Sequence, residues 1–416
     1  MSFETICVVG LGYIGLPTAA IIASRRRKVI GLDVNLAVVE SINRGETHIV
    51  EPDLDAVVRM AVADGYLRAT TLAEPADVFV VAVPTPFRDG HIPDLSYIEA
   101  ASRTIAPVLR PGNLVILEST SPVGATEAMA EWLAAARPDL TFPASRGADS
   151  DIRIAHCPER VLPGNVLREL VQNDRVIGGL TARCSEAAVA LYRIFVEGEC
   201  MVTDARTAEM CKLTENSFRD VNIAFANELS LICDGIGVDV WELIRLANRH
   251  PRVNILQPGP GVGGHCIAVD PWFIVHSSPG TARLIRSARE VNDGKPHWVV
   301  ERVRTLVAEQ AGRVKVACMG LAFKPNIDDL RESPALDICL ALASTGDCEV
   351  LAVEPHIEEL PGQLEGKAPL VSAEQAVREA DIVVFLVNHS AFRALPRDGF
   401  GDKVLFDACG FLRNGA

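Results

Sequence analysis

The chain has 416 residues, of which 49% are hydrophobic and 23% are charged, and its formal net charge at pH 7 is −14. This composition excludes a wholly disordered chain. The excess of acid argues against nucleic acid as the main partner, because phosphate contacts need surplus Lys and Arg. At roughly 150 residues per domain, the length predicts two to three domains.

The sequence shows no signal for export or for a membrane span. No apolar run approaches the ~18 residues of a transmembrane helix, and the first residues lack the basic region of a signal peptide. The eleven cysteines are at least nine positions apart, which excludes the CxxC pairs of redox motifs and most structural zinc sites. We therefore expect a cytoplasmic protein with reduced, mostly buried cysteines and no metal site.

The first segment has the pattern of a strand, a tight turn and a helix. The apolar run Ile6–Val9 is followed by the glycine motif Gly10–Gly15 and an apolar helical stretch, and a second strand, Val29–Asp33, ends in a carboxylate. Asp77–Pro84 and Leu114–Ser119 are apolar runs like the strands inside a parallel sheet. Strands separated by helical segments predict a doubly wound α/β sheet.

The middle of the chain has a helical pattern. Residues 207–234 contain no Gly or Pro, and their apolar side chains recur at helical spacing, which predicts one long helix. Val240–Asn248 and Arg283–Asn292 are further helical segments. Between them, the Pro- and Gly-rich run Gln257–His265 cannot form regular structure.

The C-terminal part returns to the first pattern. Short apolar strands are expected at Val314–Met319, Glu349–Val353, Asp381–Val387 and Val404–Phe406. The third has the same lead-in as an N-terminal strand, Ala380-Asp381-Ile382 against Ala76-Asp77-Val78. We therefore predict an α/β chain of two Rossmann-like doubly wound domains joined by a central helical segment with one long helix. The predicted boundaries are 1–200, 201–310 and 311–416.

The glycine motif Gly10-Leu11-Gly12-Tyr13-Ile14-Gly15 leaves a predicted strand and opens a predicted helix, as a dinucleotide-binding turn does. Gly10 allows the tight turn, Gly12 lets the backbone approach a pyrophosphate, and Gly15 allows the helix to pack closely. Asp33 lies 21 positions after Gly12, where a carboxylate binds ribose hydroxyls and repels a 2′-phosphate. The sequence predicts NAD in preference to NADP; the alternative is a glycine turn without a ligand.

Cys266 differs from the other cysteines because it follows the run Gly263-Gly264-His265 and precedes Asp270. A thiolate in such a loop can add to a carbonyl group, and neighbouring N–H groups can receive the oxyanion. The alternative is a buried Cys behind a structural turn. His265 suggests a metal ligand, but no other cluster of ligands accompanies it.

A row of polar residues follows one face of the predicted long helix. Lys212 and Asn216 are four residues apart, Asp220 continues the row, and Arg219 lies beside it. Such a row is commonly a solvated face. The helix is otherwise rich in apolar residues, and a Lys in buried surroundings can take part in proton transfer. Both interpretations remain open.

Seven segments together resemble the UDP-glucose/GDP-mannose dehydrogenase family from end to end. They are GLGYIGLP (10–17), VPTPF (83–87), ESTSPVG (118–124), CPERVLPG (157–164), EMCKLTENSFRDVNIAFANE (209–228), HPRVNILQPGPGVGGHC (250–266) and GLAFKPNIDDLRESPA (320–335). The PERVLPG, NILQPGPG and GGHC variants look most like the branch that acts on UDP-N-acetyl-D-mannosamine. Glucose-specific members usually have Ser where His265 stands.

The resemblance implies an enzyme that oxidises the C6 alcohol of a UDP-sugar to a carboxylate and reduces two NAD per sugar. It also implies a homodimer built on the long helix, in which the arginine matching Arg252 reaches the active site of the neighbouring subunit. The implied pathway is the synthesis of a surface polysaccharide such as enterobacterial common antigen.

The resemblance also assigns roles to matching positions. Cys266 would capture the C6 aldehyde as a thiohemiacetal, which a second oxidation converts to a thioester that water hydrolyses. Lys212 and Asn216 would move protons and steady the oxyanion. The water would be held and activated by Thr120, Glu159 and Asp270. Contacts with NAD are implied for Tyr13, Ile14, Asp33, Thr85, Thr126 and Arg331, and contacts with the UDP-sugar for Arg160, Val161, Lys212, Asn216, Arg219, His250, Arg252, Gly263, Phe323 and Lys324.

Several alternatives remain. Within the family, the sugar would be UDP-N-acetylglucosamine or UDP-glucose. Outside it, the chain would be a two-electron NAD dehydrogenase of hydroxyacid type, which needs no cysteine, or a non-catalytic NAD-binding scaffold, against which Cys266 and Lys212 argue together. In the plainer interpretation of single residues, Arg331 and Lys324 are solvated loop cations and Glu159 caps a turn.

Overall fold

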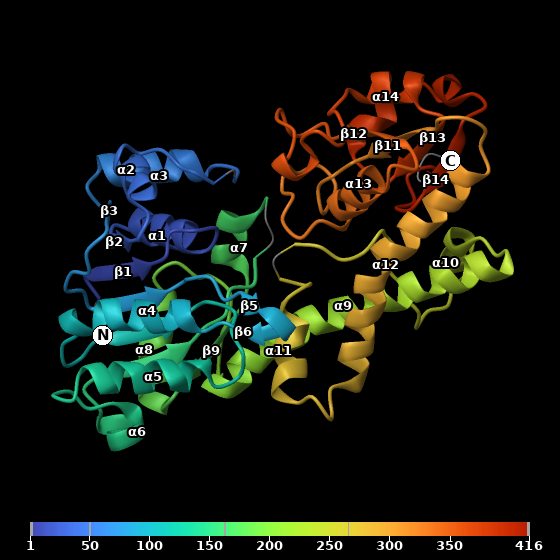
Figure 1. Cartoon of the computed structure of the whole chain (residues 1–416). Helices are drawn as coiled ribbons and strands as arrows, with labels where there is room; N and C mark the ends of the chain where they lie inside the picture. Colours follow the sequence, from blue (N-terminus) through green and yellow to red (C-terminus); the bar gives the residue numbers. More distant parts are fainter. Residues whose placement is uncertain (1–2, 50, 162–163, 265, 414–416) are drawn as a thin grey trace. The chain divides into compact units, whose positions relative to one another are not determined.

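The computed structural model describes residues 3–49, 51–161, 164–264 and 266–413. The chain divides into two compact units, residues 1–215 and 216–416, and the division falls inside the long helix α9 (Ala205–Ile236). Each unit contains its own α/β sheet (Figure 1). The predicted fold class is therefore confirmed, and the three-part division at residues 200 and 310 stays a prediction.

The sheet of the first unit has the strand order β10-β9-β8-β7-β4-β1-β2-β3 and is parallel except where β8 meets β9. Its strands are β1 (Thr5–Val9), β2 (Lys28–Leu32), β3 (Leu67–Thr70), β4 (Val78–Val81), β7 (Leu114–Leu117), β8 (Arg153–His156), β9 (Arg175–Gly179) and β10 (Cys200–Asp204). The short pair β5 (Phe87–Arg88) and β6 (Ile92–Pro93) forms a separate antiparallel hairpin. The helices are α1 (Gly15–Ser24), α2 (Leu36–Asn43), α3 (Leu54–Ala63), α4 (Ser96–Ile105), α5 (Ala125–Ala136), α6 (Pro143–Arg146), α7 (Val166–Gln172) and α8 (Ala182–Tyr192), with 3₁₀ segments at Asp89–His91, Ala106–Val108 and Gly147–Asp149.

This sheet is buried on both faces, which explains why its inner strands are apolar at successive positions. Side chains of β1 alternate between the faces: Ile6 and Val8 pack in the core with α1 and α3, while Cys7 and Val9 pack in the core with α4 and α5. Figure 1 shows these two groups of helices on opposite sides of the sheet. The packing fixes the carboxyl ends of β1, β2 and β4 at one edge, where ligands bind in folds of this type.

The second unit has a parallel sheet with the order β12-β11-β13-β14. Its strands are β11 (Lys315–Met319), β12 (Glu349–Val353), β13 (Ile382–Phe385) and β14 (Val404–Asp407). Its helices, besides the larger part of α9, are α10 (Val240–Ala247), α11 (Asp270–Ser277), α12 (Arg283–Ala308), α13 (Pro334–Thr345) and α14 (Ala373–Glu379), with 3₁₀ segments at Gly362–Leu364, Ser390–Ala394 and Arg397–Phe400. One face of the sheet packs against α12 and α13, and the other packs against α14.

Both sheets repeat one local construction, which lies at the two matching strand lead-ins. In the first sheet, the Asp77 carboxylate accepts the backbone N–H groups of Glu4 and Thr5 at 2.8 and 3.0 Å. In the second, the Asp381 carboxylate accepts the N–H of Lys315 at 2.8 Å. Each carboxylate thus ties the start of the central strand to the neighbouring strand.

Some elements are not visible in the sequence pattern. These are the strands β3, β8, β9 and β10, the β5–β6 hairpin, and the part of α12 beyond the predicted segment Arg283–Asn292. Among the described residues, no helix combines the length and the apolar content that crossing a membrane requires.

Candidate functional site

The glycine motif forms the predicted turn between β1 and α1. Gly10 has a φ of 88°, and a Cβ there would lie 2.6 Å from the carbonyl oxygen of Ala82. A Cβ on Gly15 would lie 1.8 Å from the carbonyl oxygen of Gly10, so α1 packs directly on the turn. Gly12 is exposed, and nothing lies within 4 Å of a Cβ placed on it. The first and third glycines serve the fold, while the second leaves space at the N-terminus of α1.

Asp33 follows β2 and is tied to the same turn. Its Oδ2 accepts the N–H of Leu11 at 2.8 Å, and its Oδ1 accepts the N–H of Asn35 at 2.9 Å. The carboxylate is half-buried, and the adjacent Val34 is 96% exposed. An open turn with a carboxylate at its rim fits NAD, because the turn would hold the pyrophosphate and Asp33 the ribose hydroxyls.

Two further predicted NAD contacts are themselves held by hydrogen bonds within the first unit. Thr85 donates its hydroxyl to the carbonyl oxygen of Thr120 at 2.5 Å, which brings a predicted cofactor contact next to a predicted water-holding residue. Thr126 is buried at the start of α5, and it donates its N–H and its hydroxyl to Oε1 of Glu209 at 2.8 and 2.6 Å. The polar groups of Thr126 are thus engaged by a glutamate that the sequence does not single out.

The other predicted NAD contacts lie at the surface of their units. In the glycine turn, Tyr13 is 37% exposed and Ile14 is half-buried. Arg331 belongs to the second unit, where its side chain is 52% exposed and pairs with Asp329 at 2.6 Å. Because the guanidinium side of this pair is exposed, Arg331 can exchange Asp329 for a ligand.

Glu159, after β8, lies in a buried ion pair. Its Oε2 lies 2.8 Å from Nη1 of Arg175, and both side chains are at most 5% exposed. Its Oε1 accepts the backbone N–H of Arg160 at 2.5 Å. Both oxygens of Glu159, the predicted water-activating carboxylate, are therefore fixed by partners. The turn-capping interpretation accounts for the bond to the N–H of Arg160 but not for the ion pair with Arg175.

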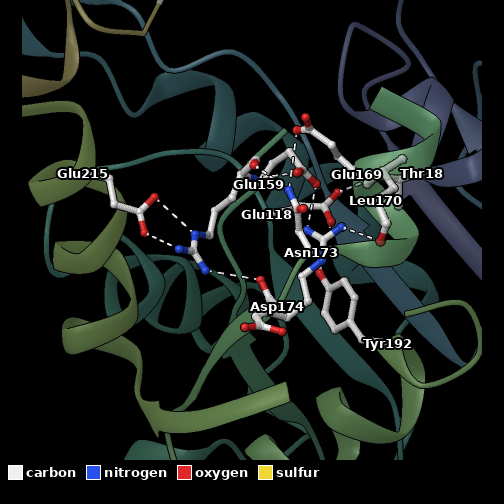
Figure 2. A network of polar contacts seen from close by, with 11 residues as sticks. Thr18, Glu118, Glu159, Glu169, Leu170, Asn173, Asp174, Tyr192 and Glu215 are labelled. Atoms are coloured by element: carbon white, nitrogen blue, oxygen red, sulfur yellow. Dashed lines mark hydrogen bonds and ion pairs between the residues drawn. The ribbon is translucent and has the colours of Figure 1, made fainter. Parts of the chain in front are cut away.

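A second buried carboxyl group, that of Glu118 directly after β7, belongs to the same network (Figure 2). Its Oε2 accepts the hydroxyl of Thr18 at 3.2 Å, and its Oε1 accepts the hydroxyl of Tyr192 at 3.1 Å. Burial and then the charge of Glu159 raise the pKa of Glu118 to about 7. A carboxyl group that titrates near neutrality can hold or release a proton at the working pH.

Arg160 connects this network to α9, and Figure 2 shows its partners Glu215 and Asp174. Its Nη2 lies 2.7 Å from Oε1 of Glu215, and its Nη1 donates to the carbonyl oxygen of Asp174 at 3.2 Å. Val161 beside it is half-buried. A substrate contact by Arg160 would have to share a guanidinium that is already engaged, and this role stays a prediction.

The polar row on α9 is buried over part of its length. Lys212 is half-buried, whereas Asn216 and Asp220 are buried. Nδ2 of Asn216 donates to the carboxylate of Asp270, which the sequence also predicts to be catalytic. Oδ1 of Asp220 accepts from Nη1 of Arg289 at 2.6 Å. The solvated-face interpretation is therefore wrong for Asn216 and Asp220.

Cys266 is exposed, whereas the other ten cysteines are buried or half-buried. Its carbonyl oxygen accepts the N–H of Asp270 at 2.9 Å, at the beginning of α11. Burial raises the pKa of Cys7 and of Cys157 to about 12, which leaves these thiols inert. The interpretation of Cys266 as a buried Cys behind a turn is wrong. His265 lies outside the described residues.

The glycine loop before Cys266 packs directly on another loop of the same unit. A Cβ on Gly263 would lie 2.3 Å from the carbonyl oxygen of Glu332 and 2.9 Å from the Cβ of Phe323. Gly264 has a φ of 81°, and a Cβ on it would lie 2.9 Å from the ring of Phe323. The structure thus brings together Gly263 and Phe323, both predicted substrate contacts, and only glycine fits between the loops.

The remaining predicted substrate contacts are more exposed. His250 and Arg252 lie at the surface of the second unit, where the N–H of Arg252 donates to Nδ1 of His250 at 3.3 Å. Arg219 on α9 is exposed, and Lys324 beside Phe323 is half-buried. Three cations are thus available at the surface of this unit for a diphosphate, and their individual roles stay predictions.

Glu354, His356 and His389 are described residues close enough to share a cation, since their ligand atoms lie within 4.8 Å of one another. Both ring nitrogens of His389 already make hydrogen bonds, however. Nε2 lies 3.0 Å from Oε2 of Glu354, and Nδ1 accepts the N–H of Asn326 at 3.0 Å. The hydrogen bonds of this group satisfy the imidazole without a metal.

Several buried partners of the predicted residues were not expected from the sequence. Glu118 had a signal, because it begins the ESTSPVG segment. Glu354 also had one, because it directly follows β12 as Asp33 directly follows the corresponding strand β2. Arg175 had none, because nothing near it in the sequence points to Glu159.

Comparison with known proteins agrees with this geometry. Three models of the UDP-glucose/GDP-mannose dehydrogenase family match in order: the NAD binding domain over residues 4–196, the central domain over residues 206–294 and the UDP binding domain over residues 317–414.

Relatives match over nearly the whole chain. It is 66% identical over 410 residues to the NDP-N-acetyl-D-galactosaminuronic acid dehydrogenase of Ralstonia nicotianae, covering 99% of this chain and 96% of the relative. It is 64% identical over 420 residues to the UDP-N-acetyl-D-mannosamine dehydrogenase of Salmonella typhi, covering 99% and 100%. The solved UDP-D-ManNAc dehydrogenase of Pyrococcus horikoshii is 39% identical and superposes with a TM-score of 0.88 over 98% of this chain and 96% of that one. The chain therefore belongs to the UDP-glucose/GDP-mannose dehydrogenase family and uses NAD.

Proposed function

We propose that the chain oxidises the C6 alcohol of UDP-N-acetyl-D-mannosamine to the carboxylate of UDP-N-acetyl-D-mannosaminuronate and reduces two NAD per sugar. The observation that carries the proposal is the exposed Cys266, whose glycine loop packs on Phe323 of the UDP binding domain. A four-electron dehydrogenase must retain the aldehyde between its two oxidations, and a thiol does so covalently. Relatives named UDP-N-acetyl-D-mannosamine dehydrogenase support the choice of sugar.

The cofactor supplies the oxidant: NAD, when bound, accepts one hydride from C6 in each oxidation. The open side of the turn at Gly12 would receive the pyrophosphate, where the N-terminus of α1 offers N–H groups and partial positive charge. Asp33 would accept the ribose hydroxyls.

In the proposed mechanism, Lys212 takes the proton of the C6 hydroxyl as the first hydride leaves, which yields the aldehyde. The thiolate of Cys266 adds to the aldehyde carbon, and the carbonyl oxygen takes up a proton to give a thiohemiacetal. Loss of the second hydride from this carbon, with transfer of the hydroxyl proton to Lys212, gives a thioester. Water then adds, the C–S bond breaks, and the two protons of the water leave to the neighbouring bases and the solvent as the thiolate and the carboxylate product separate.

The polar residues predicted for the site would support these steps. Asn216 would steady the oxyanion together with Lys212, and its bond to Asp270 fixes the amide orientation that this requires. Thr120, Glu159 and Asp270 would hold and activate the hydrolytic water. The ion pair with Arg175 supports Glu159 as a fixed carboxylate in this task.

We also propose a homodimer built on α9. Phe218, Phe225, Ile232 and Ile236 are 68%, 53%, 50% and 68% exposed, and their spacing places them on one face of the helix. An exposed apolar face of this kind supports an interface between copies of the chain.

The proposed setting is the cytoplasm, in the synthesis of a surface polysaccharide such as enterobacterial common antigen. All eleven cysteines are thiols, which suits a reducing compartment. The charged sugar acid that the reaction yields is a building block suited to an anionic polysaccharide.

A substrate panel tests the choice of sugar. UDP-N-acetyl-D-mannosamine should give a higher kcat/KM than UDP-N-acetylglucosamine and UDP-glucose. UDP-N-acetyl-D-galactosamine belongs in the panel, because one relative is named NDP-N-acetyl-D-galactosaminuronic acid dehydrogenase. Preference for a gluco- or galacto-configured sugar would overturn the assignment. Absence of turnover across the panel, with NAD still bound, would favour the non-catalytic alternative.

The variant Cys266→Ser tests the nucleophile. It should bind UDP as the unmodified protein does and form no sugar acid, because the serine hydroxyl is a far weaker nucleophile than a thiolate. Normal acid formation by this variant would rule out the thioester.

A further inference from the structure

We propose that His389 is a positioning residue: its Nε2–H tautomer, held by Glu354, fixes the backbone of Asn326 and so sets the loop of residues 320–331 for nucleotide binding. This inference rests on the proposed function, because it takes Phe323 and Lys324 of that loop as substrate contacts.

The acid partner of His389 is buried and accepts backbone N–H groups. The side chains of Glu354 and His389 are 0% exposed. Oε2 of Glu354 accepts the N–H groups of Leu321 and Ala322 at 2.8 and 2.9 Å and lies 3.0 Å from Nε2 of His389. Burial alone would raise the pKa of Glu354, but the bonds from His389 and the backbone outweigh it and lower the pKa. An ionised Glu354 has no hydrogen to donate, so Nε2 of His389 must carry the proton.

The other ring nitrogen fixes the tautomer independently. Nδ1 of His389 accepts the backbone N–H of Asn326 at 3.0 Å. A backbone N–H can only donate, so Nδ1 must present a lone pair. One imidazole satisfies both partners only as the neutral Nε2–H tautomer.

Asn326 is the point at which the loop needs this support. Its φ is 63°, a left-handed conformation that residues other than glycine adopt uncommonly. Its Oδ1 accepts the N–H and the hydroxyl of Ser390 at 2.9 and 2.8 Å. Glu354 thus holds the beginning of the loop through Leu321, and His389 with Ser390 holds its middle. Phe323 lies between these two anchors.

A comparison of the two sheets explains this use of the acid. The N–H of Gly10 donates to the last residue of β2, and the N–H of Gly320 donates to the last residue of β12, both at 2.8 Å. Asp33 and Glu354 follow those strands and accept the N–H of the residue after each glycine. Asp33 keeps an open side for a ribose, whereas Glu354 is covered by His389. The second acid is therefore a support for the loop and not a ligand of a second dinucleotide.

The test compares three variants of the full chain. His389→Phe keeps the ring shape and loses both bonds, and His389→Asn keeps an oxygen near the position of Nδ1. His356→Phe is the matched control, because His356 is exposed and packs against His389 with ring centroids 5.0 Å apart. The measurements are KM for UDP-N-acetyl-D-mannosamine, KM for NAD, and the Kd of UDP by calorimetry.

His389→Phe should raise KM for the UDP-sugar and the Kd of UDP about 10-fold, because a buried N–H loses its acceptor, and should leave KM for NAD within about twofold. His389→Asn should recover most of the loss, and His356→Phe should show none. Equal changes in both KM values, or no recovery by His389→Asn, would overturn the proposal.

A milder variant covers the case in which His389→Phe does not fold. Asn326→Gly keeps the left-handed backbone and the N–H but loses the bonds to Ser390, and it should weaken UDP binding about threefold. Unchanged UDP binding by this variant would contradict the proposal. Failure of the proposed function can be told apart from failure of this proposal. In that case the unmodified chain would oxidise none of the sugars, while UDP binding by the variants would still show whether His389 positions the loop.

Discussion

Replacing Glu118 with Gln should stabilise the protein at neutral pH, and the gain should grow as the pH rises to about 7. Glu118 is 0% exposed and accepts the hydroxyls of Thr18 and Tyr192. Gln has nearly the same shape, keeps an oxygen that accepts one of these bonds, and carries no charge at any pH. It therefore removes the cost of a buried carboxylate at the smallest structural change.

The magnitude follows from the pKa of Glu118, which burial and then the charge of Glu159 raise from 4.5 to about 7. A raised pKa means that the folded state binds the proton more tightly than the unfolded state. The stability of the unmodified protein therefore falls as the pH rises from 4.5 to about 7 and levels off above that. At about 1.4 kcal/mol per pH unit, the total loss is about 3 kcal/mol.

The assay is urea unfolding from about pH 5 to about pH 8, with Glu131→Gln on an exposed part of α5 as the control. The difference in the free energy of unfolding between Glu118→Gln and the unmodified protein should increase by about 1.4 kcal/mol per pH unit up to about pH 7 and then stay constant. A difference that does not change with pH, or a variant that is less stable at about pH 8, would refute the reasoning.

Three further predictions address the cofactor, the chemistry and the assembly. Lys212→Ala should lower kcat about 100-fold or more with little change in KM, as expected for a proton-transfer group. An unchanged kcat would show that Lys212 takes no part in catalysis. Asp33→Ser should raise kcat/KM for NADP relative to NAD, because it removes the carboxylate that repels a 2′-phosphate; an unaltered ratio of the two would reject that role. Phe225→Glu should yield monomers in light scattering, because it places a charge on the apolar face of α9; a mass that still equals two chains would remove α9 as the interface.

The fold could be predicted where the residues of a strand or helix have a pattern typical of that element. β1 and β4 are apolar at nearly every position, as strands covered on both faces are. β10 lies at the edge of its sheet, and its side chains are exposed or half-exposed, so its composition resembles that of a loop. The helix α12 continues through Gly294 and Pro296, two residues that a local reading takes as breaks. In β10 and α12, packing against the rest of the fold determines the secondary structure, and the local sequence does not.

Some features of the candidate site could likewise be predicted from the sequence, and others could not. The glycine turn and the loop before Cys266 are visible in the sequence, because their backbone geometry requires particular residues at fixed spacing. Arg175 lies 16 residues from its partner Glu159, and His389 lies 35 residues from Glu354. No local pattern relates residues so far apart, and only the folded sheets bring them together.

The central claim is that Cys266 retains the aldehyde between two oxidations, and the yield of NADH per sugar tests it most directly. With excess NAD and a limiting amount of UDP-N-acetyl-D-mannosamine, the reaction should form about two NADH per sugar, and an added carbonyl reagent should trap no aldehyde. About one NADH per sugar, with the aldehyde released into solution, would contradict the account.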